Sequence, residues 1–570
     1  MRKKNYYSES LKLFWKNKLA VLSLLILIVL VISAIFAPVL TPYDPNKQVL
    51  ADKLLFPSSE HLFGTDEFGR DILSRIIYGS RVSISIGIVA QIIASIVGVT
   101  LGSLAGYYGD SLDSLDVAVH LEEICGQRVP EEEYALCRCV EDAALLLLRL
   151  EQGGAPEAAP EEEKTVTPIT RFEDTPEYAA FQQRLRTADE TGNPYFLCND
   201  SPLRDTSLHD GREILNFSSY NYAGMSGRPE TVKAAQEAAA HYGCSASASR
   251  LLGGEKPIHK KLENAIAAWK HTEDAVVLVG GHSTNVTIVG NFCGKGDLII
   301  YDALAHNSIH EGTRLSDAES RPFPHNDTAA LETILRSCRD KYAKVLIVAE
   351  GVYSMDGDIA PVPELVRIKK EYGCFLMIDE AHSACVLGRT GGGVDEYFGL
   401  AGDDIDMKMG TLSKGLGTCG GYLAGSRALI EYLRYNLPGF VFSVGISPPL
   451  AAATLEAIRL LQDDPSIMEN LHRNIRCFRE EAKKRHFNTC LAGETAILPI
   501  LVGRDEDAFA LSMALLERGV FAPSAVYPAV PRGKARLRFC VISEHKPEQI
   551  VTALNTLQEI AAELGIKLPE

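Results

Sequence analysis

Four short apolar runs recur through the C-terminal two-thirds of this 570-residue chain. They are AVVLVG (residues 275–280), DLIIYD (297–302), KVLIVAE (344–350) and CFLMID (374–379). Amphipathic helical patterns lie between them. This alternation predicts an α/β fold with a large, mostly parallel sheet covered by helices on both faces. Sheets of this kind place their ligands at the C-terminal ends of the strands.

A lysine in a glycine-rich stretch, Lys414 in TLSKGLGTCGGY (residues 411–422), is the first candidate for chemistry. A lysine amine attacks an aldehyde when its pKa is lowered, and the hydroxyls of Thr411 and Ser413 suit a phosphate. The stretch lacks the GxxxxGK[ST] pattern of a P-loop. Taken alone, it is better interpreted as a surface loop.

Asp379 changes that interpretation. It ends the fourth apolar run, so we expect it to be buried, where a carboxylate needs a partner. The ring nitrogen of pyridoxal phosphate is such a partner, because a carboxylate keeps it protonated and the ring then withdraws electrons. His382, three residues later, is placed to reach the ring oxygen. The alternative for Asp379 alone is a helix cap at the end of a strand.

Several motifs occur in the order found in one enzyme family. They are YDALAHNSIHEG, FPHND, EGVYSMDGDIAP, MIDEAHSACVLG, TLSKGLGTCGG and VPRGKARLRF. This series resembles the α-oxoamine synthases, fold-type I pyridoxal phosphate enzymes that include serine palmitoyltransferase, 8-amino-7-oxononanoate synthase and 2-amino-3-ketobutyrate CoA ligase. The resemblance assigns residues 169–570 to the enzyme. It implies a smaller C-terminal α/β domain and a homodimer with shared active sites.

The resemblance also implies residue roles. Lys414 binds the cofactor and moves protons at the substrate Cα, Asp379 pairs with the ring nitrogen, and His306 stacks on the ring. Other implied cofactor-binding residues are His382, His282, Ser283, Glu350, Ser354, Thr411, Ser413 and Ser443, the last reaching the phosphate from the partner subunit. Arg538 is expected to hold the amino-acid carboxylate, and Tyr220 to line the substrate site. No metal is expected.

The implied reaction condenses serine, glycine or alanine with an acyl-CoA or acyl-carrier-protein thioester. Its products are a 2-amino ketone, CO2 and the free thiol. Tyr220 stands where several family members have Asn. A Tyr at this position resembles serine palmitoyltransferases, which slightly favours serine and a long acyl chain. The alternatives are 8-amino-7-oxononanoate synthase or 2-amino-3-ketobutyrate CoA ligase activity.

The N-terminus has a different character. Residues 1–18 carry six basic residues against one acid, and residues 19–40 form an uncharged apolar run long enough to span a bilayer. A signal peptide is the alternative, but the run is long for one. Residues 82–108 form a weaker second span, or a buried helix pair. The basic flank places the N-terminus in the cytoplasm and predicts a membrane-anchored protein with a cytoplasmic catalytic domain.

Residues 61–109 resemble the N-terminal part of a dipeptide ABC-transporter permease, through FGTDEFGRDILSRIIYGSR. We therefore treat residues 1–109 as a permease-like membrane segment. The rival function, a truncated transporter subunit, lacks the remaining permease helices. A third interpretation makes this segment a fusion artefact, which leaves a cytoplasmic enzyme.

Residues 110–152 resemble the middle of an acyl carrier protein. Ser111 lies in a DSL motif and keeps the family's spacing to Leu121, Glu122 and Glu123, which predicts 4′-phosphopantetheine attached to Ser111. The alternative is an N-capped amphipathic helix with an acidic face, because a carrier's first helix is replaced by permease-like sequence. Residues 153–168, rich in Ala, Pro and Glu, are expected to be an extended linker.

The formal net charge of -17 opposes nonspecific binding to nucleic acid. The 13 cysteines show no zinc-like pairs and are expected to be mostly reduced thiols.

Overall fold

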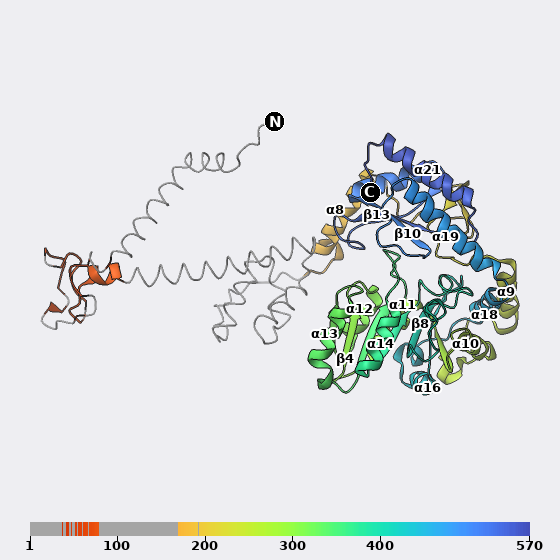
Figure 1. Ribbon diagram of the computed structural model, residues 1–570, viewed down its shortest axis with the longest axis horizontal. Helices are drawn as coiled ribbons and strands as arrows, with labels where there is room; N and C mark the ends of the chain where they lie inside the picture. The colour runs from red at the N-terminus through yellow and green to blue at the C-terminus, as the bar shows by residue number, and fades with distance from the viewer. Residues whose placement is uncertain are drawn as a thin grey trace. The chain divides into compact units, whose positions relative to one another are not determined.

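The computed structural model describes residues 169–191 and 193–569, with short stretches between residues 37 and 78. These are called the described residues below. The chain divides into two compact units, Met1–Val166 and Thr167–Glu570. The second unit holds the α/β fold (Figure 1).

Seven strands form the central sheet of this unit, in the order β3-β9-β8-β7-β6-β4-β5. All pairings from β8 to β5 are parallel, whereas β9 is antiparallel to both of its neighbours. The strands are β3 (Asp274–Leu278), β4 (Leu298–Asp302), β5 (Glu319–Phe323), β6 (Val345–Glu350), β7 (Phe375–Asp379), β8 (Met407–Thr411) and β9 (Gly421–Gly425). The predicted mostly parallel sheet is confirmed, and the four apolar runs form β3, β4, β6 and β7.

Helices cover both faces of the sheet, because successive strand residues point to opposite sides. In β6, Val345 and Ile347 join one apolar core, and Leu346 and Val348 join the other. The helices of the first core are α10 (Pro257–Trp269), α13 (Thr328–Cys338), α14 (Val362–Tyr372) and α18 (Pro448–Asp463). Those of the second are α11 (Gly281–Phe292), α12 (Asn307–Leu315), α16 (Arg427–Asn436) and α17 (Pro438–Val441).

A smaller C-terminal α/β domain is present, as predicted. Its antiparallel sheet has the order β10-β13-β12, formed by β10 (Ile497–Gly503), β12 (Ser524–Ala525) and β13 (Ala535–Cys540). A second small sheet joins β1 (Thr206–His209), β2 (Arg212–Asn216) and β11 (Val520–Phe521). The helices of this domain are α19 (Ser466–Lys484), α20 (Asp505–Glu517) and α21 (Pro547–Glu563). Buried residues of β13 and α21 belong to the first apolar core, which therefore joins the two domains.

The remaining elements connect these layers. They are η2 (Phe172–Asp174), α8 (Pro176–Thr191), α9 (Pro229–Tyr242), η3 (Arg250–Gly254), η4 (Arg339–Lys341) and α15 (Val394–Phe398). α9 packs against α18.

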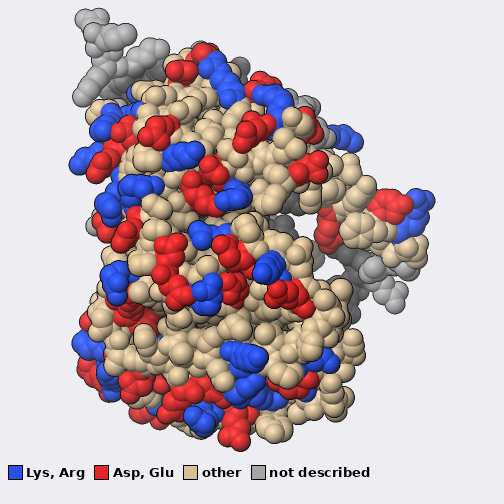
Figure 2. Space-filling view, turned by 90° about the vertical axis from the view of Figure 1, so that its right-hand side faces the viewer, with Lys and Arg blue, Asp and Glu red and all other residues tan. Residues whose placement is uncertain are grey.

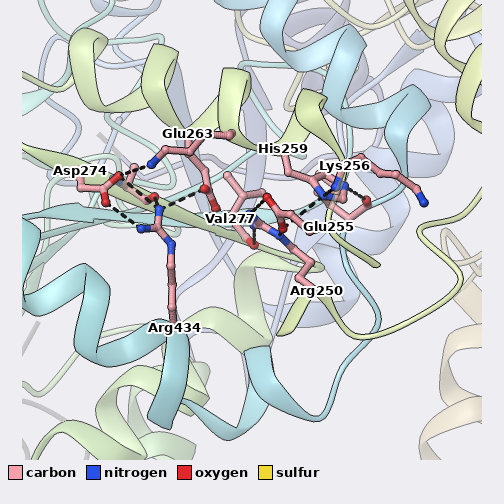
Figure 3. A network of polar contacts seen from close by, with 11 residues as sticks. Arg250, Glu255, Lys256, His259, Glu263, Asp274, Val277 and Arg434 are labelled. Carbon is pink, nitrogen blue, oxygen red and sulfur yellow. Dashed lines mark hydrogen bonds and ion pairs between the residues drawn. The ribbon is translucent and has the colours of Figure 1, made fainter. Parts of the chain in front are cut away.

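A buried ion network fixes the end of the sheet at β3 (Figure 3). Glu263 of α10 accepts from Arg250 Nη1 at 2.5 Å and from Arg434 Nη2 at 3.0 Å. Arg434 also pairs with Asp274 of β3 through Nη1 and Oδ2, at 2.7 Å. Loss of one partner from such a network is expected to destabilise the protein, because it leaves a buried charge unpaired.

A second buried network lies beside the end of β7. Lys270 pairs with Glu380 and, at 3.4 Å, with Asp395 Oδ1. Lys408 of β8 pairs with Asp395 Oδ2 at 2.7 Å. All four side chains are buried. Outside this interior, the face shown in Figure 2 has Lys and Arg interspersed with Asp and Glu, so it carries no extended basic patch.

In the first unit, the acids of the FGTDEFGRD motif hold their own segment together. Asp66 accepts from Arg70 Nε at 2.8 Å, and Asp71 contacts His61 Nδ1 at 3.0 Å and Ser74 N at 2.8 Å. No helix of the described residues is long and apolar enough to cross a membrane. The predicted spans at 19–40, apart from Ala37, and at 82–108 lie outside the described residues. So do the carrier-like segment 110–152, with Ser111, and the linker 153–168.

Candidate active site

Parallel strands bring the predicted site residues to one edge of the sheet. Glu350 and Asp379 are the last residues of β6 and β7. Lys414 follows β8 by three residues, and His306 follows β4 by four. Because β4, β6, β7 and β8 are mutually parallel, these side chains share the C-terminal edge of the sheet, as the sequence predicted.

The amine of Lys414 contacts a histidine rather than an acid. Its Nζ lies 2.8 Å from Nε2 of His382. Burial lowers the pKa of Lys414 to about 8, against the opposing effect of the Asp379 and Glu350 carboxylates. A lysine that loses its proton near neutral pH is a competent nucleophile toward an aldehyde.

Asp379 is buried without a cationic partner among the described residues. Its Oδ2 accepts from Asn285 Nδ2 at 2.7 Å, and its Oδ1 accepts from the backbone N–H of Ala381 at 2.8 Å. Both partners are neutral. A buried carboxylate held by neutral donors still favours a nearby positive charge.

His382 is held by a tyrosine that the sequence interpretation missed. Its Nδ1 lies 2.8 Å from the hydroxyl of Tyr222, which is fully buried. Burial lowers the pKa of His382 well below its usual range, and the nearby Lys414 and Arg538 charges lower it further. The ring is therefore neutral, and its other nitrogen is directed at Lys414. Tyr222 belongs to the FSSYNYAG stretch, where only Tyr220 had been singled out.

His306 belongs to the same cluster through a chain of hydrogen bonds. Its Nδ1 lies 2.7 Å from Ser308 Oγ, which accepts from Asn285 Nδ2 at 2.9 Å. Burial lowers the pKa of His306. Asn285 thus connects His306 to Asp379. It lies three residues after His282 in GGHSTN, and that helical spacing is the sequence signal that could have found it.

The N-terminus of α11 and the loop after β8 form the end of the site that suits a phosphate group. A Cβ on Gly281, the first residue of α11, would lie 2.6 Å from Thr411 Oγ1, so only glycine fits this approach. Thr411 Oγ1 and Ser413 Oγ are 2.7 Å apart. Ser283 lies in the first turn of α11 with its side chain exposed. Helix N-termini with adjacent hydroxyls bind phosphate.

His282 lies at the margin of this cluster. Its ring centroid is 6.1 Å from that of His306, and its Nε2 is 3.4 Å from Glu311 Oε2. The side chain is exposed, so it is open to a ligand at the N-terminus of α11.

Arg538 of β13 is buried beside an aromatic ring. Its Nε donates to the carbonyl of Ser354 at 2.7 Å, and its Nη1 lies 3.1 Å from Cys540 Sγ. The guanidinium carbon lies 4.9 Å from the ring centroid of Tyr220, whose side chain is 43% exposed. These contacts fix the guanidinium without giving it a carboxylate, so it is available to an anionic substrate.

Within the described residues of the single chain, Glu350 lies in the cluster of site residues, whereas Ser443 does not contact it. Glu350 is buried in the cluster, and burial, with Asp379 nearby, raises its pKa well above the usual range. Ser443 donates from Oγ to the carbonyl of Val444 at 3.2 Å, and within the part of the chain described it makes no hydrogen bond to the cluster. Its role across a dimer stays a prediction.

Pyridoxal phosphate fits this arrangement. Two buried oxygens, Glu350 Oε1 and Asn285 Oδ1, have no hydrogen-bond partner among the described residues. Beside them are an amine of lowered pKa, a carboxylate without a cation, and the hydroxyls at α11. These donors and acceptors match an aldehyde, a ring nitrogen and a phosphate, respectively.

Comparisons with known proteins agree with this fit. Residues 212–557 match the family Aminotransferase class I and II, and residues 5–57 match the N-terminal TM domain of oligopeptide transport permease C. An 8-amino-7-oxononanoate synthase of Symbiobacterium thermophilum is 42% identical over 366 residues, which are 64% of this chain and 93% of the relative.

Solved structures give the same result. A serine palmitoyltransferase of Sphingomonas wittichii is 31% identical, with a TM-score of 0.66 over 70% of this chain and 100% of that chain. A high-resolution structure of SPT with PLP is also 31% identical, with a TM-score of 0.66 over 69% of this chain and 98% of that chain.

Proposed function

Because the chain belongs to the aminotransferase class I and II family, we propose that it is a pyridoxal phosphate-dependent acyltransferase. It condenses a small amino acid with an acyl thioester and releases CO2 and the free thiol, giving a 2-amino ketone. The observation that carries this proposal is Lys414, whose amine of lowered pKa lies 2.8 Å from His382, beside the buried Asp379.

Pyridoxal phosphate, when bound, supplies an aldehyde for attachment and a ring that accepts electrons from the substrate Cα. Lys414 would hold it covalently, and its amine would move the proton at the substrate Cα. Asp379 would accept a hydrogen bond from the ring nitrogen. His382 would contact the ring oxygen, and His306 would lie beside the ring. Thr411, Ser413 and the first turn of α11 would hold the phosphate.

Arg538 positions the amino acid. Its Nε donates to the carbonyl of Ser354 and its Nη1 contacts Cys540 Sγ, so the guanidinium is held in place and can pair with the substrate carboxylate. Tyr220 stacks over the same guanidinium and limits the space beside it. This crowding supports an amino acid with a small side chain.

The names of the relatives suggest two specific versions of the reaction. In 8-amino-7-oxononanoate, the amine-bearing carbon carries a methyl group, as expected if alanine supplied it. Serine palmitoyltransferase names serine and a palmitoyl chain. The 42% identity to an 8-amino-7-oxononanoate synthase supports alanine with an acyl chain that ends in a carboxylate. The Tyr220 motif instead supports serine with a long chain.

An assay of CO2 release tests the proposal. The full-length holoenzyme is given alanine, serine or glycine, each with palmitoyl-CoA or with a seven-carbon dicarboxylic acyl-CoA. We expect release with one amino acid to exceed the others by about tenfold, the discrimination that one small group in a pocket provides. Absence of CO2 from all six combinations would exclude these acyl-CoA donors, and its absence with acyl-carrier-protein donors as well would exclude the proposed reaction. The same assay with acyl-carrier-protein donors tests the carrier-linked alternative.

We also propose a homodimer in which Ser443 reaches the phosphate of the partner's site, and a membrane anchor within the N-terminal segment. The exposed side chains on either side of Ser443 support the dimer. The permease match of residues 5–57 supports the membrane anchor. Sedimentation of the holoenzyme tests the dimer. Recovery of the full-length chain in washed membranes, with release after deletion of residues 1–57, tests the anchor.

A further inference from the structure

The FPHND motif (residues 323–327) carries a histidine that bridges the central sheet and a loop beside it. His325 lies two residues after the end of β5. Its Nδ1 is 2.9 Å from Oδ1 of Asp302, the last residue of β4, and its Nε2 is 2.9 Å from Oδ2 of Asp358. Asp358 belongs to the segment between β6 and α14, called the 351–361 loop below. His325 therefore ties this loop to the sheet.

This bridge requires a charged histidine. Both ring nitrogens face carboxylate oxygens, whereas a neutral imidazole carries a single N–H donor. Burial opposes the charge, but Asp302 and Asp358 outweigh it and raise the pKa of His325 to about 10. Both carboxylates are buried, and buried pairs are screened less by salt than exposed ones. At neutral pH the ring therefore donates to both acids.

The two ends of the bridge differ in how firmly they are held. Asp302 belongs to β4, which pairs with β5 on one side and with β6 on the other. Asp358 is held through one oxygen. Its Oδ2 accepts from His325 and, at 2.7 Å, from Asn326 Nδ2, whereas its Oδ1 has no hydrogen-bond partner among the described residues. Loss of the imidazolium leaves Asp358 buried without its counter-ion, so we expect the loop end of the bridge to move.

The same loop holds the arginine that is proposed to bind the substrate carboxylate. Arg538 donates from Nε to the carbonyl of Ser354 at 2.7 Å. Ser354 lies in a closed turn with Asp358. In this turn the backbone N–H of Tyr353 donates to the carbonyl of Asp358 at 3.0 Å, and that of Gly357 donates to the carbonyl of Tyr353 at 2.9 Å. A shift of Asp358 therefore moves Ser354 and the guanidinium that it holds.

Other contacts fasten this loop to the smaller domain. Arg536 of β13 donates from Nη1 to Asp356 Oδ1 at 2.6 Å and to the carbonyl of Met355 at 3.2 Å. Thr495 donates from Oγ1 to the carbonyl of Gly357 at 2.7 Å. The loop therefore spans the two domains, and His325 ties it on the side of the central sheet.

We propose that His325 is a positioning residue that aligns Arg538 with the amino-acid carboxylate. It acts through Asp358 and Ser354 and not on the substrate itself. This inference rests on the reaction proposed above, in which Arg538 binds an amino acid, and it gives the FPHND motif a role in that reaction. The effect should fall on amino-acid affinity and not on attachment of the cofactor, since Lys414 follows β8 and lies outside the loop.

Titration of the full-length holoenzyme with alanine, serine and glycine, followed through the absorbance of the bound cofactor, tests this role. His325→Gln keeps a polar side chain but carries no charge and cannot donate at both ends of the bridge. The dissociation constant of the amino acid that wild type binds best should rise about tenfold, since small displacements of a binding group have effects of this order or larger. The cofactor spectrum without amino acid, and KM for the acyl-CoA, should stay unchanged. A merely structural role would not produce this split.

His209→Gln is the matched control. The His209 side chain is 15% exposed, against 16% for His325, and its ring contacts Asp210 and the carbonyl of Cys198. This variant should bind amino acids like wild type. Asp358→Asn removes the same ion pair from the loop side, so it should weaken binding as His325→Gln does and replaces that variant if it does not fold. Because both changes break one interaction, the double variant should lose no more affinity than either single variant.

The inference is wrong if His325→Gln and Asp358→Asn bind amino acids like wild type, if the control loses as much affinity, or if the cofactor absorbance falls together with the affinity. The two proposals also fail separately. CO2 release by wild type without a loss of affinity in the variants contradicts the role of His325 alone. Weakened amino-acid binding in the variants of a protein that releases no CO2 supports this role and contradicts the proposed condensation. An unchanged wild-type absorbance with all three amino acids contradicts both.

Discussion

Two neighbouring carboxylates, Asp379 and Glu380, belong to different buried clusters. The charges balance in the cluster of Glu380 and do not balance in that of Asp379. Glu380 pairs directly with the ammonium group of Lys270. Asp379 receives hydrogen bonds from an amide side chain and a backbone N–H, and has no ion pair among the described residues. One residue step at the end of β7 therefore separates a charge-balanced cluster from an unbalanced one.

The lysines of the two clusters show the same contrast. Burial opposes the charge of Lys270, but Glu380 and Asp395 outweigh it and raise its pKa. At Lys414 burial prevails and lowers the pKa to about 8. The balanced cluster is complete within the chain and contributes to the fold. The unbalanced cluster lacks a charged partner, and the chain does not supply one. Such a cluster is typical of a ligand site.

The largest expected effect comes from Lys414→Ala. Activity should fall by at least about 10³-fold, because the variant loses both the covalent attachment and the proton transfer at Cα, and proton transfer alone contributes about 10²–10⁴-fold. The visible absorbance of the bound cofactor should disappear with it. Initial rates of CO2 release and absorbance spectra measure both effects.

Lys408→Met, at the lysine of the balanced cluster on β8, is the control. It should keep the absorbance while lowering stability. If Lys414→Ala retains a normal spectrum, Lys414 is not the attachment site.

Glu380→Gln tests the balanced cluster. It leaves Lys270 buried without its carboxylate, so the free energy of unfolding should fall by about 3–5 kcal/mol. Chemical denaturation measures the change. Glu431→Gln, on the exposed surface of α16, should change stability by no more than about 0.5 kcal/mol. Equal stability of the two variants would show that Glu380 contributes nothing to the fold.

Much of this contrast could be predicted from the sequence. The strand that ends in Asp379 is an unbroken apolar run, and Lys414 lies in a glycine-rich motif, so the sequence predicted both residues. The sheet order around them was only partly predictable. GYLAG, which forms β9, has little of the β-branched content that identifies strands, and its antiparallel direction depends on pairing with β3 and β8.

The partners of the site residues were harder to predict. Asn285 and Tyr222 contact Asp379 and His382 across 94 and 160 positions of the chain. A sequence pattern reports spacing along one element, whereas these contacts depend on how separate elements pack. The balanced cluster was missed for the same reason, since Lys270, Glu380, Asp395 and Lys408 come from four different segments.

The lowered pKa of Lys414 predicts a pH effect of about tenfold. In protein freed of cofactor, the rate of pyridoxal phosphate capture should rise about tenfold between pH 7 and pH 9, following the neutral fraction of an amine with pKa about 8. Absorbance after rapid mixing measures this rate. A profile that rises only near the ordinary value of 10.5 would contradict the lowered pKa.

The same shift affects stability. Because the folded-state pKa is below the unfolded value, the cofactor-free protein should gain stability as pH rises from about 8 toward 10.5. Below pH 8 the cost of burying the charged amine is fully present. Lys414→Ala should remove this part of the pH dependence in thermal unfolding.

The smallest effect is expected from the loss of a single hydroxyl. Two buried tyrosines, Tyr222 and Tyr422, offer a matched pair of variants. Tyr222→Phe removes the hydrogen bond to His382 Nδ1. Since one such bond contributes about 1 kcal/mol, kcat should fall about fivefold with little change in KM. The hydroxyl of Tyr422 is equally buried but has no hydrogen-bond partner among the described residues. Tyr422→Phe should therefore leave kcat unchanged and stability unchanged or slightly raised. If both variants lose the same activity, packing rather than the orientation of His382 explains the effect, and Tyr222 is not a positioning residue.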